Sequence, residues 1–117
     1  MYTGYFGAAK KYPAHLRLVS IARFCRFWQG ELYIELAPPP ELLRIDDRET
    51  YARLYRERVL SRLNPRKVYA DLGDSVVLLC YEKWENVRLG KAFCHRRMVA
   101  AWLEDCIEGL RVDELEV

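Results

Sequence analysis

The chain has 117 residues, of which 51% are hydrophobic, and its 19 Lys and Arg nearly balance 17 Asp and Glu, leaving a formal net charge of +2. This length suits a single domain spanning residues 1–117, with enough apolar side chains to close a core without metal or disulfide support. The balanced charge argues against a protein that coats nucleic acid mainly by neutralising phosphates.

The first residues lack the basic segment and long apolar run of an export signal, and no run of about eighteen apolar residues follows. We therefore expect a cytoplasmic protein with no membrane partner. Its cysteines are too few and too scattered for a disulfide framework, and in a reducing compartment they indicate thiols or metal ligands, so disulfide bonds are not expected. These cysteines are Cys25, Cys80, Cys94 and Cys106.

Two short apolar segments come first in the chain. Residues 2–7 are rich in aromatics and glycine, which predicts a buried strand that ends where the backbone lies close to another group. Residues 16–22 are β-branched and aliphatic, and they predict a second strand that ends at Arg23. Residues 24–37 lack a clean period and predict a packed aromatic loop with a brief extended piece at 32–36.

The middle of the chain carries helix signals. The prolines at 38–40 suit a proline-initiated turn, because the first helical turn does not need the N–H that proline lacks. Residues 46–49 form a start that resembles a capping box, and apolar residues at helical spacing over 51–63 predict the helix that follows. An Asn-Pro pair then starts a shorter helix over 66–72, which ends at Gly73.

The last third of the chain combines the clearest strand with the clearest amphipathic helix. Residues 75–82 are a continuous apolar run, as expected for a strand buried on both faces of a parallel sheet. A loop over 84–93 leads to a helix that starts at Cys94 and ends near Gly109, and the tail 112–117 is an edge strand or a frayed end. Strands interleaved with helices predict a three-layer α/β domain with a mainly parallel sheet.

Several chemically active side chains are predicted at the carboxyl ends of these strands. In an open α/β sheet, ligands bind outside this edge, and a helix N-terminus there offers unpaired N–H groups to an anion. We therefore expect a pocket for a small anionic or phosphate-bearing ligand. The residues expected to form it are Tyr5, Gly7, Arg23, Cys80, Glu82, Cys94, His95 and Arg96.

Three of these residues are candidates for catalysis. Cys94 combines a helix N-terminus with cationic neighbours, which favours a reactive thiolate, whereas the alternative is a small buried side chain. His95 is in phase with the apolar stripe of its helix, so its ring is expected to tuck toward the sheet, either as a packing residue or as a catalytic partner. Glu82 either pairs with Arg96 or acts as a general base.

The remaining five residues are candidates for ligand binding. Arginine far outnumbers lysine in the chain, and its planar guanidinium suits paired contacts with phosphate or carboxylate. Arg23 and Arg96 each fall at the end of an element that faces the predicted edge. The ligand-binding candidates are Tyr5, Gly7, Arg23, Cys80 and Arg96.

A metal or a cofactor is not expected from the motifs. A zinc site made by Cys80, Cys94 and His95 lacks the paired short spacings of structural zinc sites, and an adjacent Cys and His seldom reach the same ion. The chain also lacks the glycine-rich dinucleotide fingerprint, the phosphate-binding loop and the zinc-protease motif. The sequence therefore predicts neither metal nor cofactor.

The pattern of the central segments resembles the domain of unknown function 488 family (DUF488). Residues 78–83 (Leu-Leu-Cys-Tyr-Glu-Lys) and 94–96 (Cys-His-Arg) match its "cysteine, one residue, glutamate … cysteine-histidine-arginine" pattern. Residues 2–7, 20–23 and 36–38 also look like early segments of that family, so the resemblance covers nearly the whole chain. It implies a small, single-domain, Rossmann-like α/β fold, and it implies no settled activity.

The chain departs from that family pattern in two places. Residues 84–93 form a longer link between the glutamate and the Cys-His-Arg motif, which changes the expected shape of the pocket. Residues 24–27 (Phe-Cys-Arg-Phe) replace a polar turn that contains proline.

Two classes of function remain open, with a third as a minor alternative. The first is a small enzyme, or a degenerate one, that acts on an anionic or nucleotide-like ligand in the predicted pocket. The second is a non-catalytic module that binds nucleic acid or a protein through surface arginines and the aromatic loop 24–34. The third is a fold stabilised by a metal. The balanced charge favours the first class, and the lack of a complete catalytic constellation favours the second.

Overall fold

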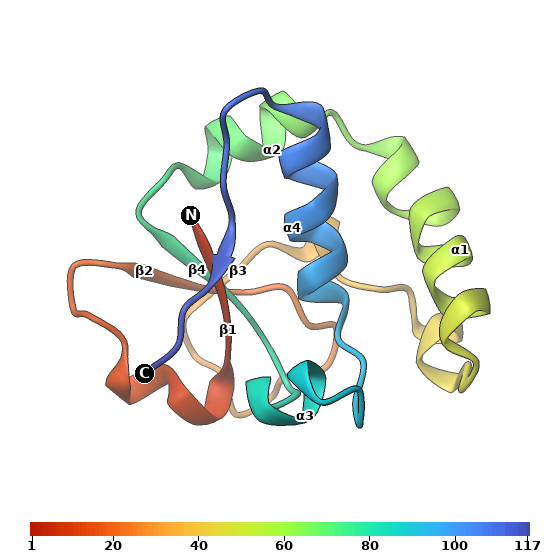
Figure 1. The fold of residues 1–117 in the computed structure, drawn as a ribbon, viewed down its shortest axis with the longest axis horizontal. Coiled ribbons are helices and arrows are strands. Elements are labelled where there is room, and N and C mark those ends of the chain that lie inside the picture. Colours follow the sequence, from red (N-terminus) through yellow and green to blue (C-terminus); the bar gives the residue numbers. More distant parts are fainter.

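The computed structural model describes residues 1–117 and contains one five-stranded sheet in the order β3-β2-β4-β1-β5, with every neighbouring pair parallel (Figure 1). The α/β fold with a parallel sheet is therefore confirmed, and the three predicted main strands lie side by side. The strands are β1 (Tyr2–Tyr5), β2 (Arg17–Ser20), β3 (Glu31–Leu32), β4 (Val76–Cys80) and β5 (Asp113–Glu114).

The central strand β4 is buried along its whole length, as its apolar sequence predicts. It pairs with β1 on one side and β2 on the other, so that both Thr3 and Val19 lie opposite Leu78. Because side chains alternate along a strand, Leu78 joins the core on one face, and Val77 and Leu79 join a smaller core on the other.

Three α-helices cover one face of the sheet (Figure 1). They contribute Tyr55, Leu72, Val99 and Leu103 to the same core as Leu78, and each of these side chains is at most 2% exposed. The three helices of this layer are α1 (Arg48–Arg58), α2 (Pro65–Leu72) and α4 (His95–Cys106). The short helix α3 (Trp84–Arg88) lies apart from the layer. None of the helices is long and apolar enough to cross a membrane.

The opposite face carries a thinner layer, made by a 3-10 helix and the aromatic loop. Residues 6–11 form this helix, η1 (Phe6–Lys11), where a longer strand was expected. The hydroxyl of Tyr12 accepts a hydrogen bond from the Tyr5 amide at 3.1 Å and lies against Gly4, where any Cβ would clash with the Tyr12 ring. The Tyr12 ring therefore lies close to the backbone of β1 at Gly4, as the glycine in this strand predicts.

Side-chain caps start α1 and α2 close to the predicted positions, whereas α1 ends at Arg58, before the predicted residue 63. The carboxylate of Asp47 accepts a hydrogen bond from the Thr50 amide at 3.0 Å, and Asn64 accepts one from the Arg66 amide at 3.0 Å. Gly73 then ends α2 at a φ of 76°, which favours glycine. The remaining 3-10 helices are η2 (Ile34–Leu36), η3 (Pro40–Arg44) and η4 (Leu60–Arg62).

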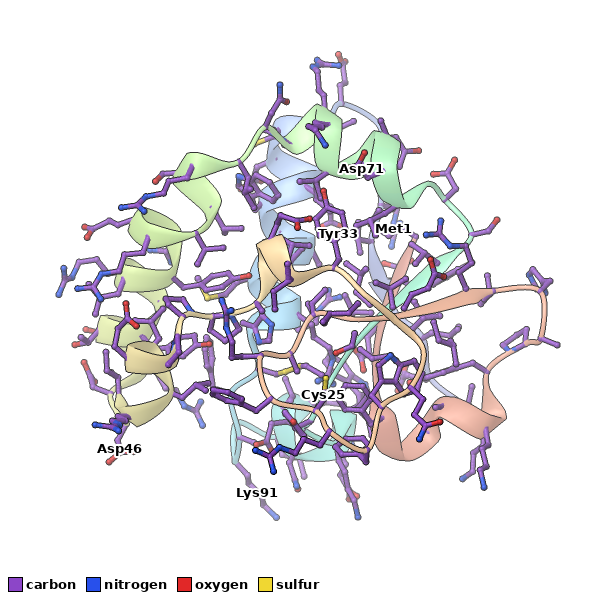
Figure 2. All side chains as sticks on the ribbon, turned by 180° about the vertical axis from the view of Figure 1, so that it is seen from behind. Met1, Cys25, Tyr33, Asp46, Asp71 and Lys91 are labelled. Atoms are coloured by element: carbon purple, nitrogen blue, oxygen red, sulfur yellow. A yellow bond between two sulfur atoms is a disulfide. The ribbon has the colours of Figure 1, made fainter.

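Two further segments differ from their predicted structure. Residues 84–88 form the short helix α3 where a loop was expected, and Trp84 donates from Nε1 to Glu116 at 3.1 Å. The extended piece expected at 32–36 is mostly the 3-10 helix η2. Next to it, the Tyr33 hydroxyl donates to Asp71 at 2.6 Å and ties this segment to α2 (Figure 2).

Replacing Leu79 with Ala should lower the free energy of unfolding by roughly 2–5 kcal/mol, because the side chain is fully buried on the central strand. Denaturant titration measures this loss. Leu89→Ala is the matched control, since Leu89 is 51% exposed and should change stability little. Equal losses in the two variants would contradict a central position for β4.

Candidate functional site

A pocket of about 280 Å³ opens at the carboxyl edge of the sheet. Its walls come from the ends of β2 and β4, the start of α4, the turn around η3 and one residue of α1, because parallel strands all end at this edge. Most of the lining is apolar. The lining residues are Ala22, Arg23, Phe24, Pro38, Leu42, Leu43, Tyr51, Cys80, Tyr81, Glu82, Phe93, Cys94 and His95.

Five of the eight predicted site residues line this pocket, and three do not. The five are Arg23, Cys80, Glu82, Cys94 and His95. Arg96 is fully buried behind the two cysteines and does not line the pocket. Tyr5 lines a separate hollow next to Trp84, and Gly7 lies in η1 on the other side of the sheet. The structure therefore does not bring Tyr5 and Gly7 to the site.

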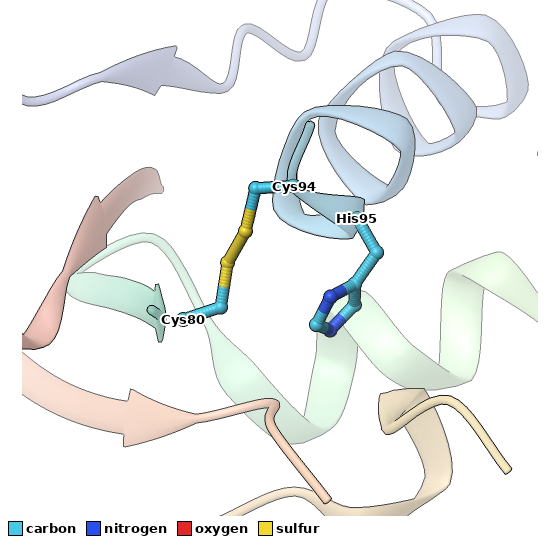
Figure 3. A group of neighbouring side chains, drawn as sticks. All are labelled: Cys80, Cys94 and His95. Atoms are coloured by element: carbon cyan, nitrogen blue, oxygen red, sulfur yellow. A yellow bond between two sulfur atoms is a disulfide. The ribbon is translucent and has the colours of Figure 1, made fainter. Parts of the chain in front are cut away.

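The inner end of the pocket is a disulfide between Cys80 and Cys94 (Figure 3). The expectation of free thiols is wrong for this pair, because the fold places the last residue of β4 against the N-cap of α4. Both cysteines are nearly buried, at 1% and 6% exposure. Cys25 and Cys106 remain free, as predicted.

Cys94 is the N-cap of α4, as the sequence predicts, and its backbone is extended, with φ −138° and ψ 132°. No side chain caps this end of the 12-residue helix. The Arg97 amide donates to the Cys94 carbonyl at 3.3 Å, whereas the N–H groups of His95 and Arg96 have no partner. Their partial positive charge favours a thiolate there once the disulfide is reduced.

His95 packs toward the sheet, which confirms its predicted orientation. Its Nε2 lies 2.7 Å from the carbonyl oxygen of Ile21, and its ring meets the Tyr55 ring edge to face at 5.5 Å. A carbonyl only accepts, so Nε2 carries the proton and Nδ1 carries the lone pair. The pKa of His95 is lowered to about 4, mainly by burial; the hydrogen bond to the Ile21 carbonyl opposes this shift, and the nearby charge of Arg96 contributes to it. The imidazole is therefore neutral near pH 7.

Arg96 forms a buried ion pair with Glu114, not with Glu82. Its Nε and Nη2 each donate to the Glu114 carboxylate at 2.9 Å, and the two side chains are 0% and 3% exposed. Its remaining nitrogen, Nη1, lies 3.3 Å from the Cys80 sulfur. The predicted pairing of Glu82 with Arg96 is wrong, because Arg96 turns inward and all three of its nitrogens have partners.

Besides His95, the polar side chains that line the pocket include Arg23, Glu82 and Tyr51. Arg23 donates from Nε to the Pro38 carbonyl at 2.9 Å and from Nη2 to the Ala37 carbonyl at 3.4 Å, so its Nη1 has no protein partner. Glu82 forms no ion pair or side-chain hydrogen bond. Burial raises the pKa of Tyr51 to about 12, which keeps its hydroxyl protonated as a donor.

The apolar wall of the pocket was not predicted as part of the site. Tyr51 has the helical spacing of a core residue, and Phe93 directly precedes the Cys-His-Arg motif, which is the one signal that pointed to its position. Leu42 and Leu43 reach the pocket because the proline-rich turn folds back over the sheet edge.

Comparisons with models of known protein families, with curated proteins and with solved structures found no match for this chain. The resemblance to DUF488 therefore stays a prediction from the sequence.

Replacing Glu114 with Gln should lower the free energy of unfolding by about 3–5 kcal/mol, because it leaves the charge of Arg96 buried without its counter-charge. Chemical denaturation measures the change. The neighbouring Asp113→Asn variant is the control, since Asp113 pairs with Arg111 on the surface and should matter little. If both variants lose the same stability, the Arg96–Glu114 pair is not the buried one.

Proposed function

We propose that the pocket is the active site of a small thiol oxidoreductase, which binds a small ligand with an apolar body and one anionic group. The observation that carries this proposal is the position of the Cys80–Cys94 pair, at the inner end of a pocket and at the N-terminus of α4. The resemblance to DUF488 adds no reaction, since that family has no settled activity.

The size and lining of the pocket support a small ligand. Its volume of about 280 Å³ is near the lower end for ligand pockets, and its aromatic and aliphatic walls suit an apolar body. The unpaired nitrogen of Arg23 and the hydroxyl of Tyr51 suit an anionic group, such as a carboxylate or phosphate. Glu82 supplies an acceptor for a donor group of the ligand, or a base.

The cysteine pair supports thiol–disulfide exchange with that ligand. In the reduced protein, the Cys94 thiolate attacks one sulfur of a bound disulfide ligand and breaks its S–S bond. One half of the ligand leaves as a thiolate, and the other half stays on Cys94 as a mixed disulfide. The Cys80 thiolate then attacks the Cys94 sulfur and expels the second ligand thiolate. Two electrons pass from the protein thiols to the ligand, and the two thiol protons end on the two released thiolates.

Each turnover leaves the protein as the Cys80–Cys94 disulfide, so a cellular thiol must reduce it again. This requirement fits the cytoplasmic location that the sequence predicts, because thiol reductants are maintained there. In this scheme Arg96 stabilises the Cys80 thiolate through its contact with the sulfur at 3.3 Å.

The second candidate function is a non-catalytic module that binds nucleic acid or a protein. The observation that favours it is an exposed aromatic surface on the loop after β2, where Phe24 is 59% and Phe27 is 62% exposed. Phe27 packs against Phe6 and Tyr81, and these three rings form one cluster. Such rings stack on unpaired bases in many nucleic-acid binding proteins.

The test uses the reduced protein with Cys25→Ser and Cys106→Ser, so that only the pair reacts, and dithiobis(nitrobenzoate) as an aromatic, anionic disulfide. Exchange predicts release of two nitrothiophenolates per protein, with none retained on the chain, as followed by absorbance and intact mass. When Cys80→Ser is added to this variant, one nitrothiophenolate should be released and a second should stay bound to Cys94 as a mixed disulfide. Retention of a nitrothiophenolate on each cysteine of the pair would refute the exchange mechanism.

Anion recognition is tested in the same assay with Arg23→Gln. The rate with dithiobis(nitrobenzoate) should fall about tenfold, whereas the rate with the neutral dithiodipyridine should not change. Arg26→Gln is the matched control, because Arg26 is exposed on the same loop outside the pocket. Equal effects of both variants would favour the surface module over the pocket.

A further inference from the structure

Three potential metal ligands meet at the inner end of the pocket. The sulfur atoms of Cys80 and Cys94 and a ring nitrogen of His95 all lie within 4.8 Å of one another, and all three residues are buried. We propose that, once the disulfide is reduced by a thiol, these residues bind one divalent ion of the zinc class. The inference goes beyond the proposed exchange reaction and does not rest on it, because it needs only the two free thiols.

The backbone at Cys94 explains how an adjacent cysteine and histidine reach one ion. Cys94 is extended and His95 is the first residue of α4, so the chain changes direction between them. Figure 3 shows both side chains on the same side of this first turn, facing Cys80. The sequence spacing argued against a shared ion because it does not reveal this change of conformation.

The separation of the two cysteines also suits a bridging ion. Their Cα atoms are 7.1 Å apart, slightly beyond the usual disulfide range of about 4.4–6.8 Å. Two sulfurs bound to one tetrahedral zinc ion at about 2.3 Å each are roughly 3.7 Å apart, which accommodates a wider backbone separation. Reduction therefore allows an ion to enter between the sulfurs without bringing the strand and helix closer.

His95 is already held in the state that a metal requires. Its Nε2–H donates to the Ile21 carbonyl at 2.7 Å, which leaves the Nδ1 lone pair free. Metal-bound histidines usually donate their other N–H to a carbonyl or carboxylate, because this contact fixes the tautomer and the ring orientation. The Ile21 carbonyl fills that position here.

The charges around the site balance when a divalent ion is bound. The two cysteines lose their protons on binding, so two thiolates and a neutral imidazole hold the ion in a site without net charge. Arg96 adds no uncompensated charge, because Glu114 neutralises it, and its Nη1 is placed to donate to the Cys80 thiolate. The burial of the site is therefore compatible with an ion.

The fourth position of a tetrahedral ion would face the pocket, since all three ligands line it. Three protein ligands and one open position are typical of catalytic zinc sites, whereas structural sites have four protein ligands. The anionic group of a pocket ligand or a water molecule would complete the coordination. The redox state of the pair then decides whether the pocket contains a disulfide or a metal ion.

Anaerobic titration with Co²⁺ tests the inference, because tetrahedral cobalt with thiolate ligands gives charge-transfer bands in the near ultraviolet and intense visible bands. The reduced, desalted protein should bind one Co²⁺ with both sets of bands, and Zn²⁺ should displace it. The oxidised protein should give neither set, which supplies a control without any mutation. Absence of the bands in protein with two titratable thiols at this site would refute the inference.

Variants assign the ligands. Cys80→Ser, Cys94→Ser and His95→Gln should each weaken Co²⁺ binding more than about 100-fold, whereas Cys25→Ser and Cys106→Ser should leave it unchanged. Unchanged binding in any of the first three, with circular dichroism confirming a folded chain, would overturn this ligand set. The exchange assay contains no metal, so confirmed exchange without cobalt binding would refute this inference alone.

Discussion

The buried ion pair between Arg96 and Glu114 connects the fold to the site. Glu114 accepts two hydrogen bonds from Arg96 and one from the Thr3 hydroxyl at 2.7 Å, so the edge strand β5 is held to both β1 and α4. Arg97 extends this network from the next position of α4, because it donates to Thr3 at 2.8 Å. A buried charge is tolerated only when such partners satisfy it, so α4 has one position relative to the sheet.

This constraint determines which cation can recognise a ligand. All three guanidinium nitrogens of Arg96 contact Glu114 or the Cys80 sulfur, so this side chain has no nitrogen left for a ligand in the pocket. Its positive charge lies next to the cysteine pair. In the proposed function, an anion would therefore be bound by Arg23, which keeps one nitrogen without a protein partner. The two arginines predicted to act together therefore have separate roles, one behind the sulfurs and one at the pocket wall.

The sequence was most informative where local rules decide the structure. The apolar runs of β2 and β4 and the start of α4 at Cys94 follow from residue patterning, and they place five predicted residues in one pocket. The Asn-Pro start of α2 likewise follows from capping. The partner of Arg96 was not predictable, because it depends on pairing of the two-residue β5 beside β1. The disulfide was missed for a similar reason: the two cysteines are 14 residues apart and meet only in three dimensions.

The central claim is that Cys80 and Cys94 lie against each other at the inner end of the pocket, and peptide mapping after mild oxidation tests it most directly. Trypsin separates the four cysteines onto peptides 24–26, 68–83, 92–96 and 98–111. After diamide treatment of the reduced protein and blocking of remaining thiols, mass spectrometry should find 68–83 linked to 92–96 and the other two peptides alkylated. Links from 68–83 or 92–96 to the other peptides, or alkylation of all four, would contradict the account.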